Sequence, residues 1–293
     1  MKKNVFVIGS MNMDYTIYCE RFPKDGETIF GSSRFIQPGG KGANQAAAVA
    51  KNNLVNCYFK ACAGNDNDGE QIIKLLSSLN AKCLIKKVEK ETGNATIFVN
   101  KASENQIIVV SGANAELLPE DISKEELESA DYVVLQNEIP AETNAHVIKE
   151  AHKLGKVVIY NPAPYREIDP ELLSMIDYFV VNEVELASYA HIEDQEKAIE
   201  TLLSKGIKHL IVTLGSKGSL YIDKNERKEI PCYKNTVVDT VAAGDTYVGY
   251  FAAGLATGLK PYDAMDLASR ASSITVSRKG SIVSIPSYEE IKL

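Results

Sequence analysis

The chain has 293 residues and a formal net charge of −7, with 45% hydrophobic and 24% charged residues. These values are typical of a globular protein that buries a sizeable core, and they exclude a chain too small or too polar to fold. The negative charge argues against a nucleic-acid-binding surface, which is usually basic, but not against a phosphate-bearing substrate, because backbone amides bind phosphate on acidic proteins.

Strand-like apolar runs alternate with helical patterns along most of the chain. Residues 4–9 form the first apolar run, and the alanine-rich residues 41–51 favour a helix. The alternation continues with strands at 55–64, 131–136, 156–162, 177–182 and 209–215, and with helices at 68–79, 144–155 and 195–206. Val/Ile-rich strands joined by helices predict an α/β fold with a central, mostly parallel sheet between helices.

Two segments without a helical pattern interrupt this alternation, at residues 14–40 and 92–114. Each contains short alternating runs around a polar turn, as hairpins do. Together they predict a small antiparallel sheet that stands off the main domain as a lid or a dimer surface; simple edge hairpins are the alternative. We therefore expect one domain over residues 1–293, with lid segments at about 14–38 and 93–112.

The cysteines and histidines indicate neither a disulfide framework nor a zinc site. The five cysteines lack CxxC spacing, and the four histidines are scattered without ligand spacing. The apolar run at residues 5–8 is too short for a signal peptide, and no run reaches the roughly 20 residues of a membrane span. We expect a cytoplasmic protein with reduced thiols and no membrane partner.

Residues 237–254, "VVDTVAAGDTYVGYFAAG", carry the clearest chemical signal, because the P-loop and GxGxxG motifs are both absent. Ala242, Ala243 and Gly244 precede Asp245 at the first turn of a predicted helix. Unpaired amides and the helix dipole make such a turn an anion hole, and a carboxylate beside it suits a base in phosphoryl transfer. An aspartate that merely caps the helix fits equally well. The segment alone leaves both interpretations open.

The wider sequence favours the catalytic interpretation. Residues 239–245 resemble the DTxxAGD signature of the PfkB-type, or ribokinase-like, sugar kinases, and "GGKGANQAAA" at 39–48 resembles their second signature. Further similar stretches follow in order from residue 9 to about 286: "GSMNMD", "FPKDGET", "IFVN", "GAN", "NPAP", "VNEVE", "VTLGSKG" and "VSRKG". The resemblance covers nearly the whole chain and is strongest to the ribokinases. It implies a parallel sheet between helices with a β lid, and ATP-dependent phosphorylation of D-ribose at the 5-hydroxyl to give ribose 5-phosphate.

The resemblance also implies roles for single residues. Asp245 resembles the general base, and the amides of Ala242, Ala243 and Gly244 resemble the anion hole for the γ-phosphate. The sugar-binding set corresponds to Asn12, Asp14, Gly40, Lys41, Gly42, Asn44 and Glu138, together with Asp245. Such a set suits a polyol, because Asp14 accepts from adjacent hydroxyls while the amides and Lys41 donate. Taken singly, Asp14 is better interpreted as a turn residue and Lys41 as a surface charge; within the matched pattern the binding roles are favoured.

The nucleotide and metal sites rest on the same resemblance. The nucleotide-binding positions are Asn182, Thr213, Gly215, Ser216, Gly218 and Gly244. Glu185, in "NEVE", corresponds to the family element that positions Mg²⁺ largely through water, although a helix-turn acid is the plain alternative. A monovalent cation, K⁺ in most relatives, would be held mostly by carbonyls at Asp239, Val241, Thr275, Arg278, Gly280 and Ser284. The resemblance further implies a homodimer formed through the lid.

Other activities in the family share the catalytic run. A 2-deoxyribose, nucleoside or other sugar kinase is the main alternative, and a catalytically silent sugar-binding protein is a further one. A site built around the 2-hydroxyl rejects the deoxy sugar, and the intact Asn12 and Asp14 favour ribose. Ala242 stands in the anion hole where many members have glycine, a change that ribokinases tolerate. Ser269, near the expected adenine position, leaves the nucleotide preference open.

Overall fold

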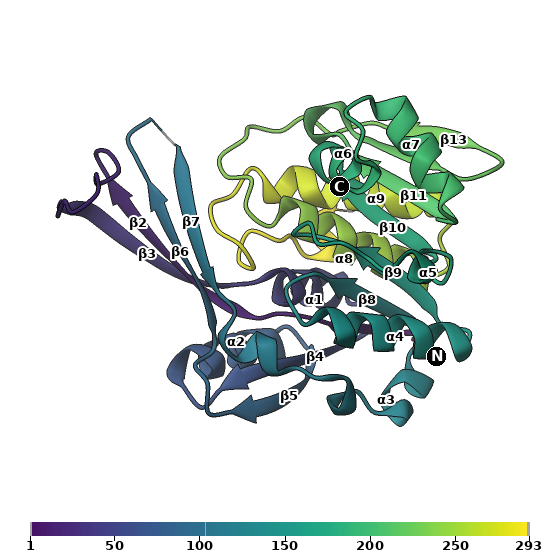
Figure 1. Cartoon of the computed structure of the whole chain (residues 1–293), viewed down its shortest axis with the longest axis horizontal. Coiled ribbons are helices and arrows are strands. Elements are labelled where there is room, and N and C mark those ends of the chain that lie inside the picture. Colours follow the sequence, from purple (N-terminus) through teal and green to yellow (C-terminus); the bar gives the residue numbers. More distant parts are fainter. Residues whose placement is uncertain (1, 103, 292–293) are drawn as a thin grey trace.

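A large mixed sheet forms the centre of the molecule (Figure 1) in the computed structural model, which describes residues 2–102 and 104–291. Within the described residues it has nine strands. Their spatial order is β13 (Arg227–Ile230), β12 (Ser219–Ile222), β11 (His209–Thr213), β10 (Tyr178–Asn182), β9 (Val157–Asn161), β8 (Tyr132–Gln136), β1 (Asn4–Ile8), β4 (Asn56–Gly64) and β5 (Lys82–Val88). The strands from β11 to β5 are parallel. Only β12 runs against them, because it pairs antiparallel with both β11 and the edge strand β13. The predicted mostly parallel sheet is confirmed.

Helices cover both faces of this sheet, as the alternating burial of the strands requires. In β1, Val5 and Val7 join one buried cluster while Phe6 and Ile8 join the other. The first cluster includes residues of α1 (Lys41–Asn52), α2 (Asn67–Ser78), α8 (Ala243–Ala256) and α9 (Pro261–Thr275). The second includes residues of α3 (Lys124–Ser129), α4 (Ala141–Lys153), α5 (Pro170–Leu173), α6 (Glu183–Ala190) and α7 (Gln195–Ser204). A short α10 (Tyr288–Ile291) ends the described chain.

The alanines of α1 allow a close helix contact that shapes the site. Gly249 of α8 faces α1 so closely that a Cβ there would lie 2.5 Å from the Cβ of Ala48 and 2.6 Å from the carbonyl oxygen of Gln45. Larger side chains would force the two helices apart. The N-terminal turn of α8 is therefore held against α1, which brings Asp245 next to Asn44 and Gln45.

The two helix-free segments form a second sheet that projects from the main body (Figure 1). Its order is β3 (Gly31–Gly39), β2 (Asn12–Cys19), β6 (Gly93–Val99) and β7 (Asn105–Val110). The prediction of a purely antiparallel sheet is wrong, because β2 and β6 pair in parallel. Both strands follow strands of the parallel central sheet, β1 and β5, and they leave it in the same direction.

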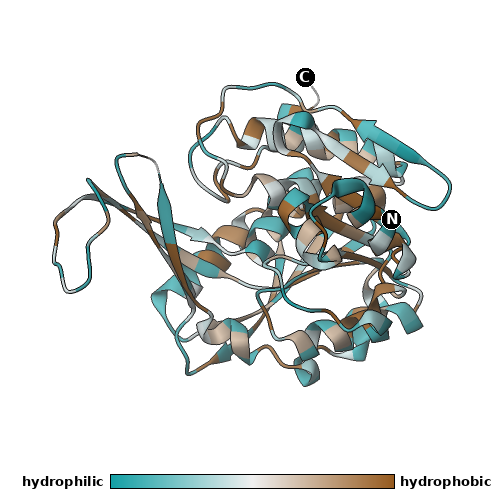
Figure 2. Ribbon diagram, turned by 45° about the horizontal axis from the view of Figure 1, so that its top comes forward, coloured by the Kyte–Doolittle hydropathy of each residue, from teal (hydrophilic) through white to brown (hydrophobic). Residues whose placement is uncertain are grey.

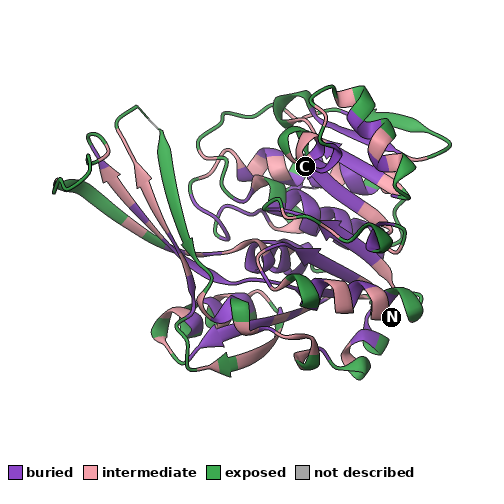
Figure 3. Cartoon of the chain, viewed as in Figure 1, coloured by how far each residue is buried: buried purple, intermediate pink, exposed green. Residues whose placement is uncertain are grey.

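Burial falls from the middle of the central sheet to the free edge of the second sheet (Figure 3). The central strands are mostly buried and apolar (Figures 2 and 3), whereas every residue of β7 is exposed. All five cysteines are free thiols, and three of them are buried. Within the described residues, no helix combines the length and apolar character of a membrane span.

Candidate active site

Asp245 lies in the first turn of α8, as the sequence predicts, and its side chain is buried with only 8% exposed. The residue before the helix, Ala242, adopts a left-handed conformation with φ of 60° and ψ of 5°. This turn leaves Gly244 facing open space, since a Cβ built there meets no heavy atom within 4 Å. The start of α8 therefore combines free space, amides without intrahelical acceptors and a buried carboxylate.

The amides of this turn are not equivalent. The amide of Ala243 donates to the carbonyl of Thr240 at 3.3 Å, so it is already partnered within the turn. Gly244 and Ala242 line a cavity of about 210 Å³ together with Asp245. Among the three predicted anion-hole residues, Ala243 is the one whose amide would have to exchange its partner to bind phosphate.

Two side-chain amides hold the carboxylate of Asp245. Asn44 Nδ2 donates to Oδ2 at 2.9 Å, and Gln45 Nε2 donates to Oδ1 at 3.1 Å. Asn44 was predicted, whereas Gln45 was not. Its only signal in the sequence is a polar residue inside an alanine-rich helix that the fold buries completely.

The predicted sugar-binding residues gather beside Asp245 on tightly packed backbone. A Cβ on Gly40 would lie 2.8 Å from the amide nitrogen of Asn12, and one on Gly42 would lie 2.5 Å from that of Ser10. Gly40 also has φ of 89°, which suits glycine. These glycines let the turn before α1 pass directly over the β1–β2 connection.

Three carboxylates and one ammonium set the charge of the site. Glu138 accepts from the amide of Lys41 at 2.9 Å and from the hydroxyl of Ser10 at 2.5 Å. Burial, with the nearby Glu138 and Asp245, raises the pKa of Asp14 to about 7. Although burial opposes the charged form of Lys41, the carboxylates around it raise its pKa. Lys41 therefore keeps its positive charge beside the carboxylates of the site.

A second cavity of about 400 Å³ extends from Asn12 and Glu138 past Asn114 toward Arg166. Asn114, which was not predicted, donates through Nδ2 to Asn12 Oδ1 at 2.7 Å and so fixes the amide of Asn12. Asn12 and Glu138 thus have hydrogen-bond partners within the protein, whereas Asn44 Oδ1 is buried without one among the described residues.

Three of the predicted nucleotide positions, Asn182, Thr213 and Gly244, line the 210 Å³ cavity, and so does Glu185, the predicted Mg²⁺ position. Asn182 and Glu185 form a reciprocal cap on α6: Glu185 N donates to Asn182 Oδ1 at 2.8 Å, and Asn182 N donates to Glu185 Oε2 at 3.0 Å. Gly215, Ser216 and Gly218 form a turn after β11 (η3, Gly215–Lys217) and do not line this cavity. Gly218 has φ of 103°, and a Cβ there would lie 2.1 Å from the carbonyl oxygen of Ile230.

The predicted cation positions come from two loops that the structure joins. Asp239 accepts from the amides of Val241 and Gly280, both at 3.0 Å, and the amide of Val238 donates to the carbonyl of Val276 at 2.7 Å. Thr275 donates through its hydroxyl to Thr246 of α8 at 3.1 Å, and Ser284 to the carbonyl of Ser281 at 2.7 Å. The guanidinium of Arg278 pairs instead with Glu290, so only its backbone remains for an ion. Across residues 2–102 and 104–291, no group of three or more His, Cys, Asp or Glu side chains is placed to hold a metal.

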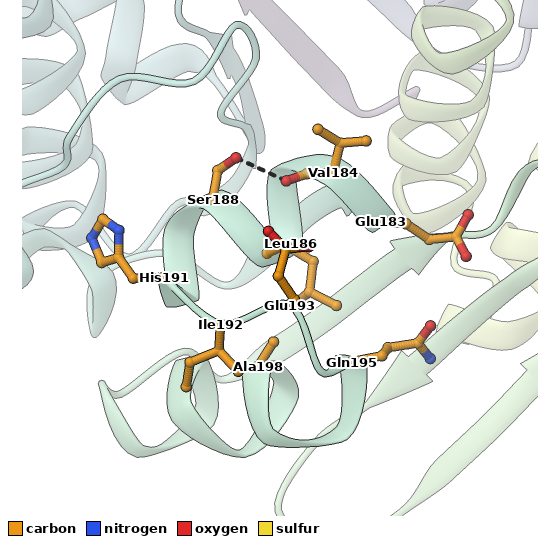
Figure 4. A pocket seen from close by; sticks show the side chains of 10 residues that line it. Glu183, Val184, Leu186, Ser188, His191, Ile192, Glu193, Gln195 and Ala198 are labelled. Atoms are coloured by element: carbon orange, nitrogen blue, oxygen red, sulfur yellow. Dashed lines mark hydrogen bonds between the residues drawn. The ribbon is translucent and has the colours of Figure 1, made fainter.

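A more voluminous cavity lies elsewhere, between α6 and α7, and measures about 620 Å³ (Figure 4). It shares no lining residue with the cavity at Asp245, and its ionisable members Glu183, His191 and Glu193 are exposed. Ser188 bonds within α6 to the carbonyl of Val184 at 2.9 Å (Figure 4). Cavity volume alone does not identify the candidate site, because the buried and hydrogen-bonded carboxylate of Asp245 lines the smaller cavity.

Comparison with known proteins gives consistent matches over the full length. The model of the pfkB family carbohydrate kinases matches residues 2–288. The chain is 38% identical to the ribokinase of Lactococcus lactis over 98% of this chain and 95% of that protein, and 37% identical to the deoxyribokinase of Salmonella typhi over 98% and 97%. The solved ribokinase structure from Thermotoga maritima has a TM-score of 0.93 at 38% identity and covers 100% of this chain and 98% of that one. Ribokinase of Arabidopsis thaliana, solved with ribose and ATP, has a TM-score of 0.91 at 33% identity, covering 100% and 98%.

Proposed function

This chain belongs to the pfkB family of carbohydrate kinases, and we propose that it transfers the γ-phosphoryl group of ATP to the 5-hydroxyl of D-ribose with Asp245 as general base. The observation that carries the proposal is the arrangement around Asp245. Its buried carboxylate accepts from Asn44 and Gln45 beside the open space at Gly244. Residues of the predicted sugar and nucleotide sets meet in the cavity that Asp245 lines.

The reaction follows from this geometry. The 5-hydroxyl of the sugar donates its proton to Asp245 as its oxygen bonds to the γ-phosphorus, and the bond from that phosphorus to the β,γ-bridging oxygen breaks to release ADP. The helix dipole of α8, the amide of Gly244 and the ammonium of Lys41 favour the negative charge on the transferring group. Asn12, Asp14 and Glu138 orient the remaining hydroxyls.

Asn182 and Glu185 suit a hydrated Mg²⁺ that accompanies ATP. They line the same cavity as Asp245, and Glu185 offers a carboxylate oxygen there. Mg²⁺ neutralises phosphate charge when bound and retains several waters, so one carboxylate without a cage of ligands fits it. Because Glu185 caps α6, the same contact holds it in place.

A monovalent cation, K⁺ in our proposal, fits the paired loops at residues 239–241 and 275–284. The loops are joined through Asp239, and Thr275 links them to α8. An ion bound to backbone carbonyls there would hold the turn that carries Gly244. We also propose a cytoplasmic location, supported by the five free thiols.

Product formation across a sugar panel tests the activity. ADP release is measured with ribose, 2-deoxyribose, fructose, adenosine and fructose 6-phosphate, with and without K⁺. We expect ribose to give the highest kcat/KM and K⁺ to raise the rate. Because the Salmonella deoxyribokinase is nearly as similar as the Lactococcus ribokinase, 2-deoxyribose is the critical comparison. Preference for any sugar other than ribose contradicts the proposed substrate.

The Asp245→Asn variant tests the base. It keeps the size of the side chain. Its new NH₂ group can bond to Asn44 once that amide rotates to present Oδ1, which has no partner among the described residues, so the fold and ribose binding should persist. We expect kcat to fall by about 10²-fold or more, because proton transfer to a positioned base contributes at least this much. Ribose binding by calorimetry is the control. Unchanged turnover contradicts the role of Asp245.

A homodimer through the lid is the proposed assembly. Ile107, Ile108 and Val109 of β7 are 53%, 61% and 54% exposed, and this apolar strand lies at the edge of the lid sheet. Exposed apolar edges are usually covered in the native assembly. Sedimentation of the wild type should give a dimer and Ile108→Asp a monomer, whereas Leu54→Asp, at another exposed apolar position, should stay dimeric. A monomeric wild type or a dimeric Ile108→Asp contradicts the proposal.

A further inference from the structure

We propose that Gln45, held by Gln136, is a positioning residue that fixes the carboxylate of Asp245 for proton transfer. The inference rests on the proposed function, because it requires Asp245 to be the base. Gln45 belongs to neither the sugar nor the nucleotide set, and it is completely buried. Its amide lies between the base and the carboxyl ends of β8 and β9.

Every hydrogen-bonding atom of the Gln45 amide has a partner. Nε2 donates to Asp245 Oδ1 at 3.1 Å and to Asn161 Oδ1 at 3.2 Å, while Oε1 accepts from Gln136 Nε2 at 2.7 Å. Rotating this amide by 180° would place its oxygen against the carboxylate of Asp245. It would also set its NH₂ group against that of Gln136. Both contacts are repulsive, so the surroundings allow a single orientation.

The neighbouring amides stand at the ends of adjacent strands, and Gln136 Oε1 has no hydrogen-bond partner among the described residues. Gln136 and Asn161 end β8 and β9 and are register partners. Asn161 Nδ2 donates to the carbonyl of Val180 at 2.9 Å, which leaves its oxygen facing Gln45. A Cβ on Gly9 would lie 1.9 Å from Gln136 Oε1, so the backbone just after β1 closes the space around that side chain.

The hydrogen-bonded amides of Asn44, Gln45 and Gln136 orient the carboxylate of Asp245 without adding charge next to it. Asn44 and Gln45 each occupy one oxygen of Asp245, which fixes the plane of the carboxylate. The donors are neutral, so they orient the base without adding the positive charge that would weaken it as a proton acceptor. The nearby charges come from Lys41 and Asp14. A base held in this way loses little orientational freedom when the sugar arrives.

Three variants test the proposal in the full chain. Gln45→Met removes both donations at similar length, Gln136→Met removes only the support of Gln45, and Gln45→Glu puts a second carboxylate beside Asp245. We expect kcat to fall about 10- to 100-fold in Gln45→Met and about fivefold in Gln136→Met, with the KM for ribose within about threefold in both. The double Met variant should be no slower than Gln45→Met, because the two residues act in series.

The pH profile separates positioning from mere stability. Gln45→Glu should move the acid limb of the kcat profile upward by about one pH unit or more, since like charges disfavour each other. Thr143→Val is the matched control: it loses a buried 2.7 Å hydrogen bond to Leu117 outside the site, so it should lower the melting temperature and leave kcat and its pH profile unchanged.

The possible outcomes are distinct. Wild-type kcat in Gln45→Met, losses that multiply in the double variant, or an unmoved acid limb in Gln45→Glu would each overturn the role of Gln45. If Gln45→Met does not fold, Gln45→Glu and Gln136→Met decide the question by the same criteria. If Asp245→Asn loses turnover while the Gln45 variants behave as wild type, only this inference is overturned. If Asp245→Asn keeps normal turnover, the proposed function is overturned as well.

Discussion

Four neighbouring strands of the central sheet end on a polar residue, and the two pairs differ in how they use it. Gln136 and Asn161 end β8 and β9, while Asn182 and Thr213 end β10 and β11. The first pair is buried and bonded to other side chains of the site. In the second pair, Asn182 is exposed and caps α6, and Thr213 is half-buried. In α/β folds, ligands bind beyond these carboxyl ends, so both pairs face the reaction.

The difference matches the two proposed ligands. The sugar and the base need side chains held at fixed positions, because proton transfer depends on orientation. The nucleotide can be bound by backbone amides and turns, which need open access more than buried contacts. We therefore expect the β8–β9 end to keep its arrangement when ligands bind, and we expect the nucleotide to enter and leave at the β10–β11 end.

A side chain added at Gly244, in the cavity shared by the proposed sugar and nucleotide sites, should have the largest effect on activity. Because no atom lies within 4 Å of a Cβ there, Gly244→Val should fold normally but fill the space proposed for the γ-phosphate. We expect kcat/KM for ATP to fall about 10²-fold with little change in melting temperature. Gly9→Ala is the contrast, since its Cβ would clash with Gln136, and it should lower the melting temperature. A Gly244→Val enzyme that uses ATP normally would show that phosphate does not bind at the start of α8.

The pH dependence of stability should show that negative charge is concentrated around Asp14 in the proposed sugar site. The pKa of Asp14 is raised from 3.8 to about 7, so folding favours its protonated form. The stability this gives is full below pH 3.8 and is lost as the pH rises to about 7. Asp14→Asn should therefore melt higher than the sugar-free wild type by about 4 °C or more at pH 8. The gap should close toward pH 4.

Calorimetry or fluorescence melting from pH 4 to pH 8 measures this difference. Asp25→Asn, at an exposed position in the same lid segment, is the control and should show no trend with pH. A constant difference between Asp14→Asn and wild type across this range would mean that Asp14 titrates normally.

The sequence predicts the fold because its signals are local, whereas the site residues are predictions that rest on the family resemblance. Strand and helix patterns lie within a few residues, and Asp245 stands inside a recognisable run. The parallel pairing of β2 with β6 was missed, since pairing depends on the directions in which distant strands leave the main sheet. Gln45, Gln136 and Asn114 were missed for a related reason. Each is an ordinary amide until the fold places it against a partner about 90 to 200 residues away.

The prediction with the smallest expected effect concerns Glu185, near the carboxyl ends of β10 and β11. The Glu185→Gln variant keeps a side-chain oxygen that accepts from the amide of Asn182, so the cap on α6 should survive. The negative charge that lines the cavity would be lost. We expect the Mg²⁺ concentration for half-maximal rate to rise about fivefold, because Mg²⁺ binds carboxylates in preference to amides. The KM for ribose should not change, since the sugar end is built from other residues.

Glu183→Gln is the matched control for this last prediction. Glu183 begins the same helix but pairs with Lys217 and does not line the cavity at Asp245. Titrating Mg²⁺ at saturating ATP and ribose should therefore separate the two variants. An equal shift in both would assign the effect to the general charge of α6. A normal Mg²⁺ requirement in Glu185→Gln would reduce Glu185 to a helix cap, and the β10–β11 end would then bind the nucleotide without a carboxylate.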